Sequence, residues 1–227
     1  DTCSPEKARE ARLAAQALYE TDFSQQVERE AEPGRFTATH RRVVNWLLAS
    51  LRDEQNLSAQ ERADCGDALA QLGDPRPGVG LRPDDLPDMA WCPVPAGPFL
   101  MGSDRARDEE ALQNEMPQHE VTLRPYAIGK YPVTNAQYEA FVKAGGYGER
   151  RYWTDVGWER KGERTEPDTR GGVFDLVNHP VVRVTWYEAV AFCRWLTERL
   201  LQAGELQPGQ EVRLPTEAEW EKAARSG

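Results

Sequence analysis

The segment from residue 147 to residue 178 combines arginine with large aromatic side chains at close spacing. Six such residues lie between positions 150 and 160: Arg150, Arg151, Tyr152, Trp153, Trp158 and Arg160. Arginine and aromatic residues are the types most enriched where binding energy concentrates at interfaces. The six are therefore the candidate ligand-binding residues. The alternative interpretation is that Trp153 and Trp158 fasten a long loop to the core.

A run of acidic residues between 104 and 110 offers oxygen ligands for a metal ion. Asp104, Asp108 and Glu109 are candidates for a Ca²⁺ site, because Ca²⁺ is bound by carboxylate and carbonyl oxygens. The alternative is a solvated acidic loop. No other metal site is predicted.

Thiol and imidazole groups are too widely spaced to predict a zinc site or a disulfide framework. The cysteines are Cys3, Cys65, Cys92 and Cys193, with no C-x-x-C pair. Cys193 falls among large apolar residues of a predicted helix, which favours a buried, unreactive thiol. We predict no catalytic residue, and no cofactor is evident from these residues.

Apolar spacing predicts helices in the first 73 residues. Ser4 is expected to cap a helix over 5–32, and Thr37 or Thr39 a helix over 40–53. Ser58 and Glu61 form a capping box for a third helix that ends at Gly73. Residues 74–90 are rich in Pro and Asp and are interpreted as a linker. The predicted organisation is a helical region over 1–73, this linker, and a second domain over 91–227.

The second domain is predicted to alternate short strands with capped helices. Strands are expected within 91–102, 119–123, 126–130 and 181–184, and a short extended piece at 212–214. Thr134, Thr185 and Thr216 are expected to cap helices, the last with Glu219 as a capping box. Residues 147–178 are predicted to be irregular. The expected fold class is α+β.

Composition restricts the class of protein. The chain has 227 residues, 39% hydrophobic and 29% charged, which is typical of a folded globular protein. The net charge of −10 argues against nucleic-acid and anionic-membrane partners. Scattered thiols without a signal-peptide pattern favour a reducing, cytoplasmic location.

Four segments occur in an informative order. They are Val94–Ser103, Glu115–Leu123 with Lys130–Tyr138, His179–Ala189 running into Phe192–Leu196, and Arg213–Glu221. In this order they resemble the formylglycine-generating enzyme (sulfatase-modifying factor) family. The resemblance covers residues 91–227, about 60% of the chain. It implies an irregular C-type-lectin-like fold.

The resemblance extends only to the N-terminal part of such a domain. The family's later motifs, of the Gly-Asn-x-x-Glu-Trp and Gly-Gly-Ser-Trp types, are not found in the 227 residues. In true formylglycine-generating enzymes that later part carries two copper-binding cysteines and calcium ligands, so the resemblance implies Cu or Ca only with that part present. We expect a second polypeptide, the other half of a nicked chain or another protein, to complete the domain.

Iron-binding relatives carry a helical domain with closely spaced histidines. The helical region here contains only His40, which is too few ligands for a facial triad. The expected function is therefore a non-catalytic domain that binds a protein or small ligand, within a larger or proteolytically processed bacterial protein.

Two alternatives remain open. The first is a copper- and oxygen-dependent formylglycine-generating oxidase, or a related non-haem iron enzyme, whose active cysteines lie in the later half. The second is an accessory sensor or effector of a bacterial defence or signalling system.

Overall fold

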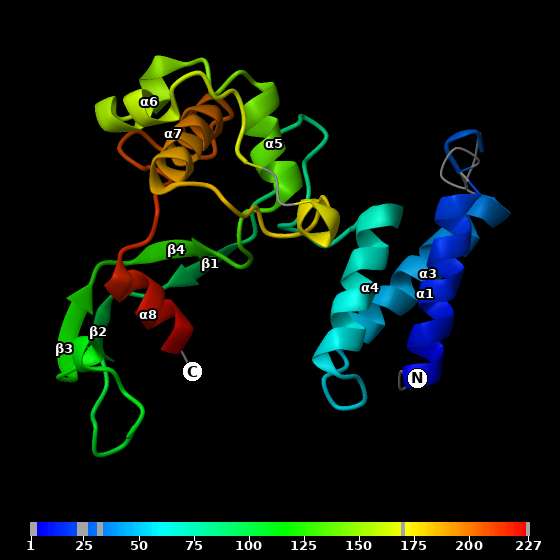
Figure 1. The fold of residues 1–227 in the computed structure, drawn as a ribbon, viewed down its shortest axis with the longest axis horizontal. Coiled ribbons are helices and arrows are strands. Elements are labelled where there is room, and N and C mark those ends of the chain that lie inside the picture. Colours follow the sequence, from blue (N-terminus) through cyan, green and yellow to red (C-terminus); the bar gives the residue numbers. More distant parts are fainter. Residues whose placement is uncertain (1–3, 22–26, 31–33, 169–170, 226–227) are drawn as a thin grey trace. The chain divides into compact units, whose positions relative to one another are not determined.

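The computed structural model describes residues 4–21, 27–30, 34–168 and 171–225 (Figure 1). Its contacts divide the chain into two compact units. The first comprises residues 1–88, 133–140 and 167–183, and the second comprises residues 89–132, 141–166 and 184–227. The chain combines α-helices with small antiparallel sheets, which is consistent with the α+β class. Within the described residues, no helix has both the length and the apolar composition needed to cross a bilayer.

The N-terminal part of the first unit is helical, as predicted. Its helices are α1 (Pro5–Glu20), α3 (Arg35–Arg52) and α4 (Ala59–Leu72). The Ser4 hydroxyl accepts a hydrogen bond from the amide of Lys7 and caps α1. The predicted capping box of Ser58 and Glu61 opens α4. The predicted length of the first helix is wrong, because α1 ends at Glu20. Of the residues predicted to continue it, 22–26 and 31–32 lie outside the described residues, as does Cys3.

The start of α3 differs from the prediction. The helix begins at Arg35 instead of residue 40, and neither Thr37 nor Thr39 is its cap. The carboxylate of Glu30 instead accepts hydrogen bonds from the amides of Gly34, Phe36 and Thr37 and from the Thr37 hydroxyl. These bonds, led by the Thr37 hydroxyl, lower the pKa of Glu30 to about 2. A carboxylate from the preceding segment thus satisfies the free amides at this helix end.

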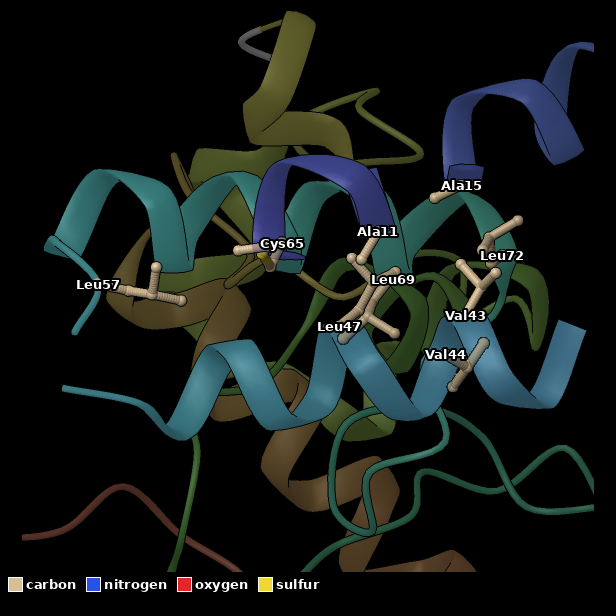
Figure 2. Packing of buried hydrophobic residues seen from close by; sticks show 10 residues of the cluster. Ala11, Ala15, Val43, Val44, Leu47, Leu57, Cys65, Leu69 and Leu72 are labelled. Atoms are coloured by element: carbon tan, nitrogen blue, oxygen red, sulfur yellow. The ribbon is translucent and has the colours of Figure 1, made fainter. Parts of the chain in front are cut away.

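The three helices share one apolar core (Figure 2). Its labelled members are Ala11 and Ala15 of α1, Val43, Val44 and Leu47 of α3, Leu57, and Cys65, Leu69 and Leu72 of α4. Small alanines on α1 let the larger side chains of α3 and α4 approach its backbone. Tyr19, near the end of α1, is 55% exposed and lies outside this core.

The segment predicted as a linker makes specific contacts with α5 (Asn135–Lys143) and the residue before it. The Gln137 amide donates to the carbonyl oxygens of Gly78 (3.2 Å) and Asp88 (2.6 Å), and the Thr134 hydroxyl donates to that of Val79 (2.7 Å). Val79 is buried. The predicted boundaries at 73 and 90 stay a prediction, but the chain between 78 and 88 is held in place.

A second set of polar contacts joins α4 to the segment before residue 180. The Asn178 amide donates to the carbonyl oxygen of Gly66 and to Asp74, and His179 Nε2 lies 2.8 Å from Asp67 Oδ1. The helical residues and this segment therefore belong to the same compact unit.

Two antiparallel ribbons dominate one part of the second unit. The strands are β1 (Trp91–Val94), β2 (Gly97–Met101), β3 (His119–Leu123) and β4 (Tyr126–Gly129), and a short 3-10 turn, η1 (Gln113–Glu115), precedes β3. β1 pairs with β4 and β2 with β3, so the two strands joined by the turn at 95–96 do not pair with each other.

Helix α8 (Glu217–Arg225) packs against β2 through polar groups. The ammonium group of Lys222 donates to the carbonyl oxygens of Pro95 and Gly97, each at 2.9 Å. The predicted capping box of Thr216 and Glu219 is confirmed.

An aromatic cluster forms the core around α7 (Trp186–Gln202), which begins at the predicted cap Thr185. Phe141 is fully buried at its centre, with ring centroids 5.7–6.3 Å from those of four neighbours. The neighbours are Tyr147, Tyr152, Phe192 and Trp195. Such tilted and edge-to-face pairs favour rigid packing.

In the predicted second domain, the sequence prediction was wrong in two segments. Residues 147–178 are not wholly irregular, because they contain η2 (Arg150–Tyr152), α6 (Asp155–Lys161) and η3 (Gly172–Asp175). Residues 181–184 form no strand. The Val181 amide instead donates a single hydrogen bond to the Val133 carbonyl, which fixes this segment without a ladder.

Candidate functional site: the pocket between α6 and α7

A pocket of about 240 Å³ lies within the second unit, between α6 and the N-terminus of α7. Hereafter it is called the α6–α7 pocket. Its lining combines cations, aromatic rings and a helix end: Trp153, Gly157, Arg160, Lys161, Arg164, Thr185, Trp186 and Tyr187. Small-molecule sites are concave and combine aromatic side chains with a few charged or polar groups, and this pocket has both.

Local sequence features bring the two helices together. Thr154 caps α6, with its hydroxyl accepting from the amide of Gly157 at 3.0 Å. A Cβ atom at Gly157 would lie 2.9 Å from the Cβ of Tyr187, so only glycine permits this close approach. On the other side, Thr185 and Glu188 form a capping box that starts α7 at the pocket wall.

Lys161 is a buried cation, 8% exposed. Its ammonium group donates to the carbonyl oxygens of Gly162 (3.0 Å) and Arg164 (3.3 Å) and lies 4.4 Å from the centre of the Trp158 ring. Desolvation, and then the nearby charge of Arg164, lower the pKa of Lys161. Carbonyl oxygens and aromatic faces thus replace the water that this charge has lost.

Glu188 places one carboxylate beneath the pocket. It is fully buried and accepts hydrogen bonds from the Tyr147 hydroxyl (2.7 Å) and the Thr185 amide (2.7 Å). Its Oε1 also lies 3.5 Å from a guanidinium nitrogen of Arg164. The charge of Arg164 is therefore balanced within the protein.

Two aromatic rings shape the open side. Trp186 is 59% exposed although it is the largest type of side chain, and its ring meets that of Tyr187 edge to face at 5.3 Å. The guanidinium carbon of Arg160 lies 5.6 Å from the centre of the Tyr187 ring. The pocket thus presents an exposed ring next to a cation.

The structure brings only part of the predicted binding residues to this pocket. Trp153 and Arg160 line it, and Trp158 lies against Lys161 beside it. Trp153 and Tyr152 are buried, so both help to fasten the segment to the core.

The remaining predicted residues lie in polar networks of their own. Arg150 pairs with Asp155 and donates to the Trp153 carbonyl. Arg151 pairs with Glu149 and Glu198 and also donates to the Tyr152 hydroxyl. Neither arginine lines the pocket. Sequence reasoning missed the α7 side of the pocket, although the Thr185 cap marked where it would lie.

The described residues do not fit a metal or copper centre. None of them form a group of three His, Cys, Asp or Glu side chains that could hold an ion. The calcium candidates Asp104, Asp108 and Glu109 are therefore not brought together as a site. The Asp104 and Asp108 carboxylates instead accept backbone hydrogen bonds within their own loop. Burial raises the pKa of the Cys193 thiol to about 11, and Cys92 is exposed on β1 without a thiol partner in the described part.

Comparison with known proteins decides the family. The family profile described as the sulfatase-modifying factor enzyme 1-like domain matches residues 80–227. The chain belongs to this family. The predicted resemblance is therefore confirmed, and the match begins ten residues before Ala90, inside the segment interpreted as a linker.

Three of the curated relatives are enzymes by name. The chain is 41% identical over 166 residues to a hercynine oxygenase of Mycolicibacterium thermoresistibile, and 38% identical over 142 residues to that of Mycolicibacterium smegmatis. It is 36% identical over 162 residues to a formylglycine-generating enzyme of Thermomonospora curvata. These matches cover 66%, 57% and 59% of this chain and 34%, 30% and 48% of the relatives. The chain thus spans about a third to a half of the length of the relatives it matches.

The expectation of a non-catalytic binding domain is wrong. It rested on the lack of a ligand set among the visible cysteines and histidines, whereas the similarity is to oxygenases and formylglycine-generating enzymes. Missing ligands in one part of an enzyme say nothing about the activity of the whole, because catalytic groups come together from distant parts of the chain.

Proposed function

We propose that this chain is part of an oxygenase-type enzyme related to hercynine oxygenase. The observation that carries the proposal is the 41% identity over 166 residues to a protein of that name. A formylglycine-generating activity is the second candidate, supported by 36% identity over 162 residues.

In this proposal the described residues bind substrate, and residues outside them supply the metal ligands. Oxygen chemistry requires a metal or cofactor, and the described side chains do not fit one. The α6–α7 pocket offers instead what substrate binding needs: a partly enclosed volume, fixed cations and an exposed aromatic ring. Arg160 and Trp153 are the predicted binding residues that this assignment retains.

The same proposal extends to the fold. A C-type-lectin-like arrangement of residues 91–227, preceded by a helical region, agrees with the small two-stranded sheets and the long ordered loops around α6. The contacts between residues 78–88 and α5 suggest that the family domain starts near residue 78, close to the start of the family match at residue 80.

Oxygen uptake tests the proposal. The intact protein, loaded with Fe(II) or Cu(I), is mixed with hercynine and a small thiol, or with a cysteine-containing peptide, in an oxygen-electrode cell. We expect oxygen consumption with one of these substrates and an oxidised product in the mass spectrum. The same preparation stripped with a chelator is the control. No metal-dependent uptake with either substrate would overturn the proposal, and the substrate that is consumed distinguishes the two candidates.

A further inference from the structure

The α6–α7 pocket carries positive charge that the protein does not balance. Glu188 offsets Arg164, but Lys161 contacts only carbonyl oxygens and aromatic rings. Arg160 lies against the Tyr187 ring, and neither Arg160 nor Lys161 has a carboxylate partner among the described residues. Three cations in one lining repel one another, and an anion between them would relieve that repulsion.

The end of α7 adds further donors at the same place. The amides of Trp186 and Tyr187 occupy the first turn of a 17-residue helix and make no hydrogen bond in the part of the chain that the structure describes. Free amides at a helix N-terminus carry partial positive charge and bind oxyanions. The helix end and the two unbalanced cations thus favour the same kind of ligand.

The aromatic side chains of the pocket indicate the shape of the rest of the ligand. The exposed Trp186 ring stands beside Tyr187, with Trp153 deeper in the lining. A volume of about 240 Å³ equals the space of roughly eight water molecules. That space admits a small molecule with one planar ring and excludes a folded partner.

We propose that the α6–α7 pocket binds a small planar organic oxyanion, with Arg160 and the α7 amides on the oxyanion and Trp186 against the planar body. This inference deepens the proposed function, because it names the class of group by which the pocket would hold a substrate. Carboxylates and phosphate esters share the chemistry, since a guanidinium group pairs with either in a bidentate manner.

Ligand-observed NMR titration of the metal-free intact protein tests the inference. The probes are benzoate, phenyl phosphate, inorganic phosphate and the neutral analogue benzamide, in 0.1 M NaCl without other organic anions. We expect benzoate or phenyl phosphate to bind with a Kd on the order of 1 mM, at least tenfold more tightly than inorganic phosphate or benzamide. Tighter binding of benzoate would identify the oxyanion as a carboxylate, and tighter binding of phenyl phosphate would identify it as a phosphate ester.

Matched variants connect binding to the pocket. R160Q removes an exposed cation and is expected to weaken binding about tenfold, the worth of one charge-assisted hydrogen bond. R199Q removes an exposed arginine from the last turn of α7, outside the pocket lining, and should leave binding unchanged. W186A removes a ring that is 59% exposed, and W220A removes one that is 63% exposed on α8. Of these two tryptophan variants, W186A should weaken binding and W220A should not. Denaturation midpoints confirm that each variant folds.

Three results would overturn the inference. They are no binding of either organic anion, equal binding of inorganic phosphate or benzamide, and binding that R160Q and W186A leave intact. Because the titration uses no metal and no oxygen, its outcome is independent of catalysis. Anion binding without turnover would refute the proposed function alone, and turnover without anion binding would refute this inference alone.

Discussion

Replacement of the buried Glu188 by alanine is the most informative perturbation of this structure. Its carboxylate accepts from the Tyr147 hydroxyl at 2.7 Å and from the Thr185 amide at 2.7 Å, and it faces Arg164 at 3.5 Å. E188A therefore removes the capping contact at the start of α7 and the hydrogen bond that holds Tyr147 in the aromatic cluster. It also removes the carboxylate that balances the charge of Arg164.

The expected loss of stability follows from these contacts. Loss of a hydrogen bond to a charged group costs about 1.5–3 kcal/mol, and the Tyr147 hydroxyl that donates to Glu188 belongs to a residue only 2% exposed. Loss of the capping contact adds about 1 kcal/mol. The Arg164 side chain is 34% exposed, so water takes over much of its charge and its contribution is small. The total is about 3 kcal/mol. E188Q keeps the shape and most hydrogen bonds, and is expected to cost about 1 kcal/mol.

Urea denaturation followed by tryptophan fluorescence measures the change. The matched control is E198A, on the same helix. Its 37% exposed carboxylate pairs with Arg151 and accepts from the Tyr152 hydroxyl at 3.1 Å, and its removal should cost about 1 kcal/mol. Surface substitutions usually change the free energy of unfolding by no more than about 0.5 kcal/mol. If E188A and E198A differ by less than that amount, the stabilising role assigned to the buried Glu188 carboxylate is refuted.

The remaining predictions concern the helical core, the thiols and acid stability. Leu47 is fully buried, so L47A should destabilise the protein by about 3 kcal/mol in the same urea assay. Since burial raises the pKa of Cys193 to about 11, iodoacetamide at pH 8 should leave it unmodified in the native protein while it alkylates exposed Cys92, as peptide mass mapping would report. Hydrogen bonds from Arg213 lower the pKa of Glu219 from 4.5 to about 2. Its stabilisation is present above pH 4.5 and is lost as the pH falls toward 2, so the wild type should lose more stability over that range than E219Q; equal losses would contradict it.

The site was only partly predictable from sequence. The arginine and tryptophan types between 150 and 160 were recognised, but α6 itself was not, because a seven-residue helix has too few positions to display a periodic pattern. Lys161 gave no sequence signal, since its role depends on burial between Trp158 and the carbonyls of the following turn.

The expected function failed for a related reason. The choice of a non-catalytic domain assumed that the cysteines and histidines of this sequence were the only available metal ligands. Similarity to enzymes corrected it, because identity over a long stretch reports common descent even where the catalytic groups themselves are not in view.

Local chemistry determined five of the helix starts. Ser4, Ser58, Thr134, Thr185 and Thr216 were read directly as caps, since the hydroxyl and the amide it accepts from lie within three residues of each other. The family was also determined by sequence, through ordered motifs that need no coordinates. These features depend on neighbours along the chain.

Tertiary structure alone decided everything that depends on distant neighbours. The strands on either side of the turn at 95–96 do not pair with each other, because β1 pairs with β4 and β2 with β3. The pocket exists because Gly157 lets α6 approach Tyr187, thirty residues further on. Glu188 lies far from both Arg160 and Arg164 in the sequence, but in the fold its carboxylate lies 3.5 Å from Arg164. This contact decides that Arg164 is the cation whose charge is balanced. Tertiary packing, and not the pattern of residue types along the chain, therefore decides which charged side chains pair.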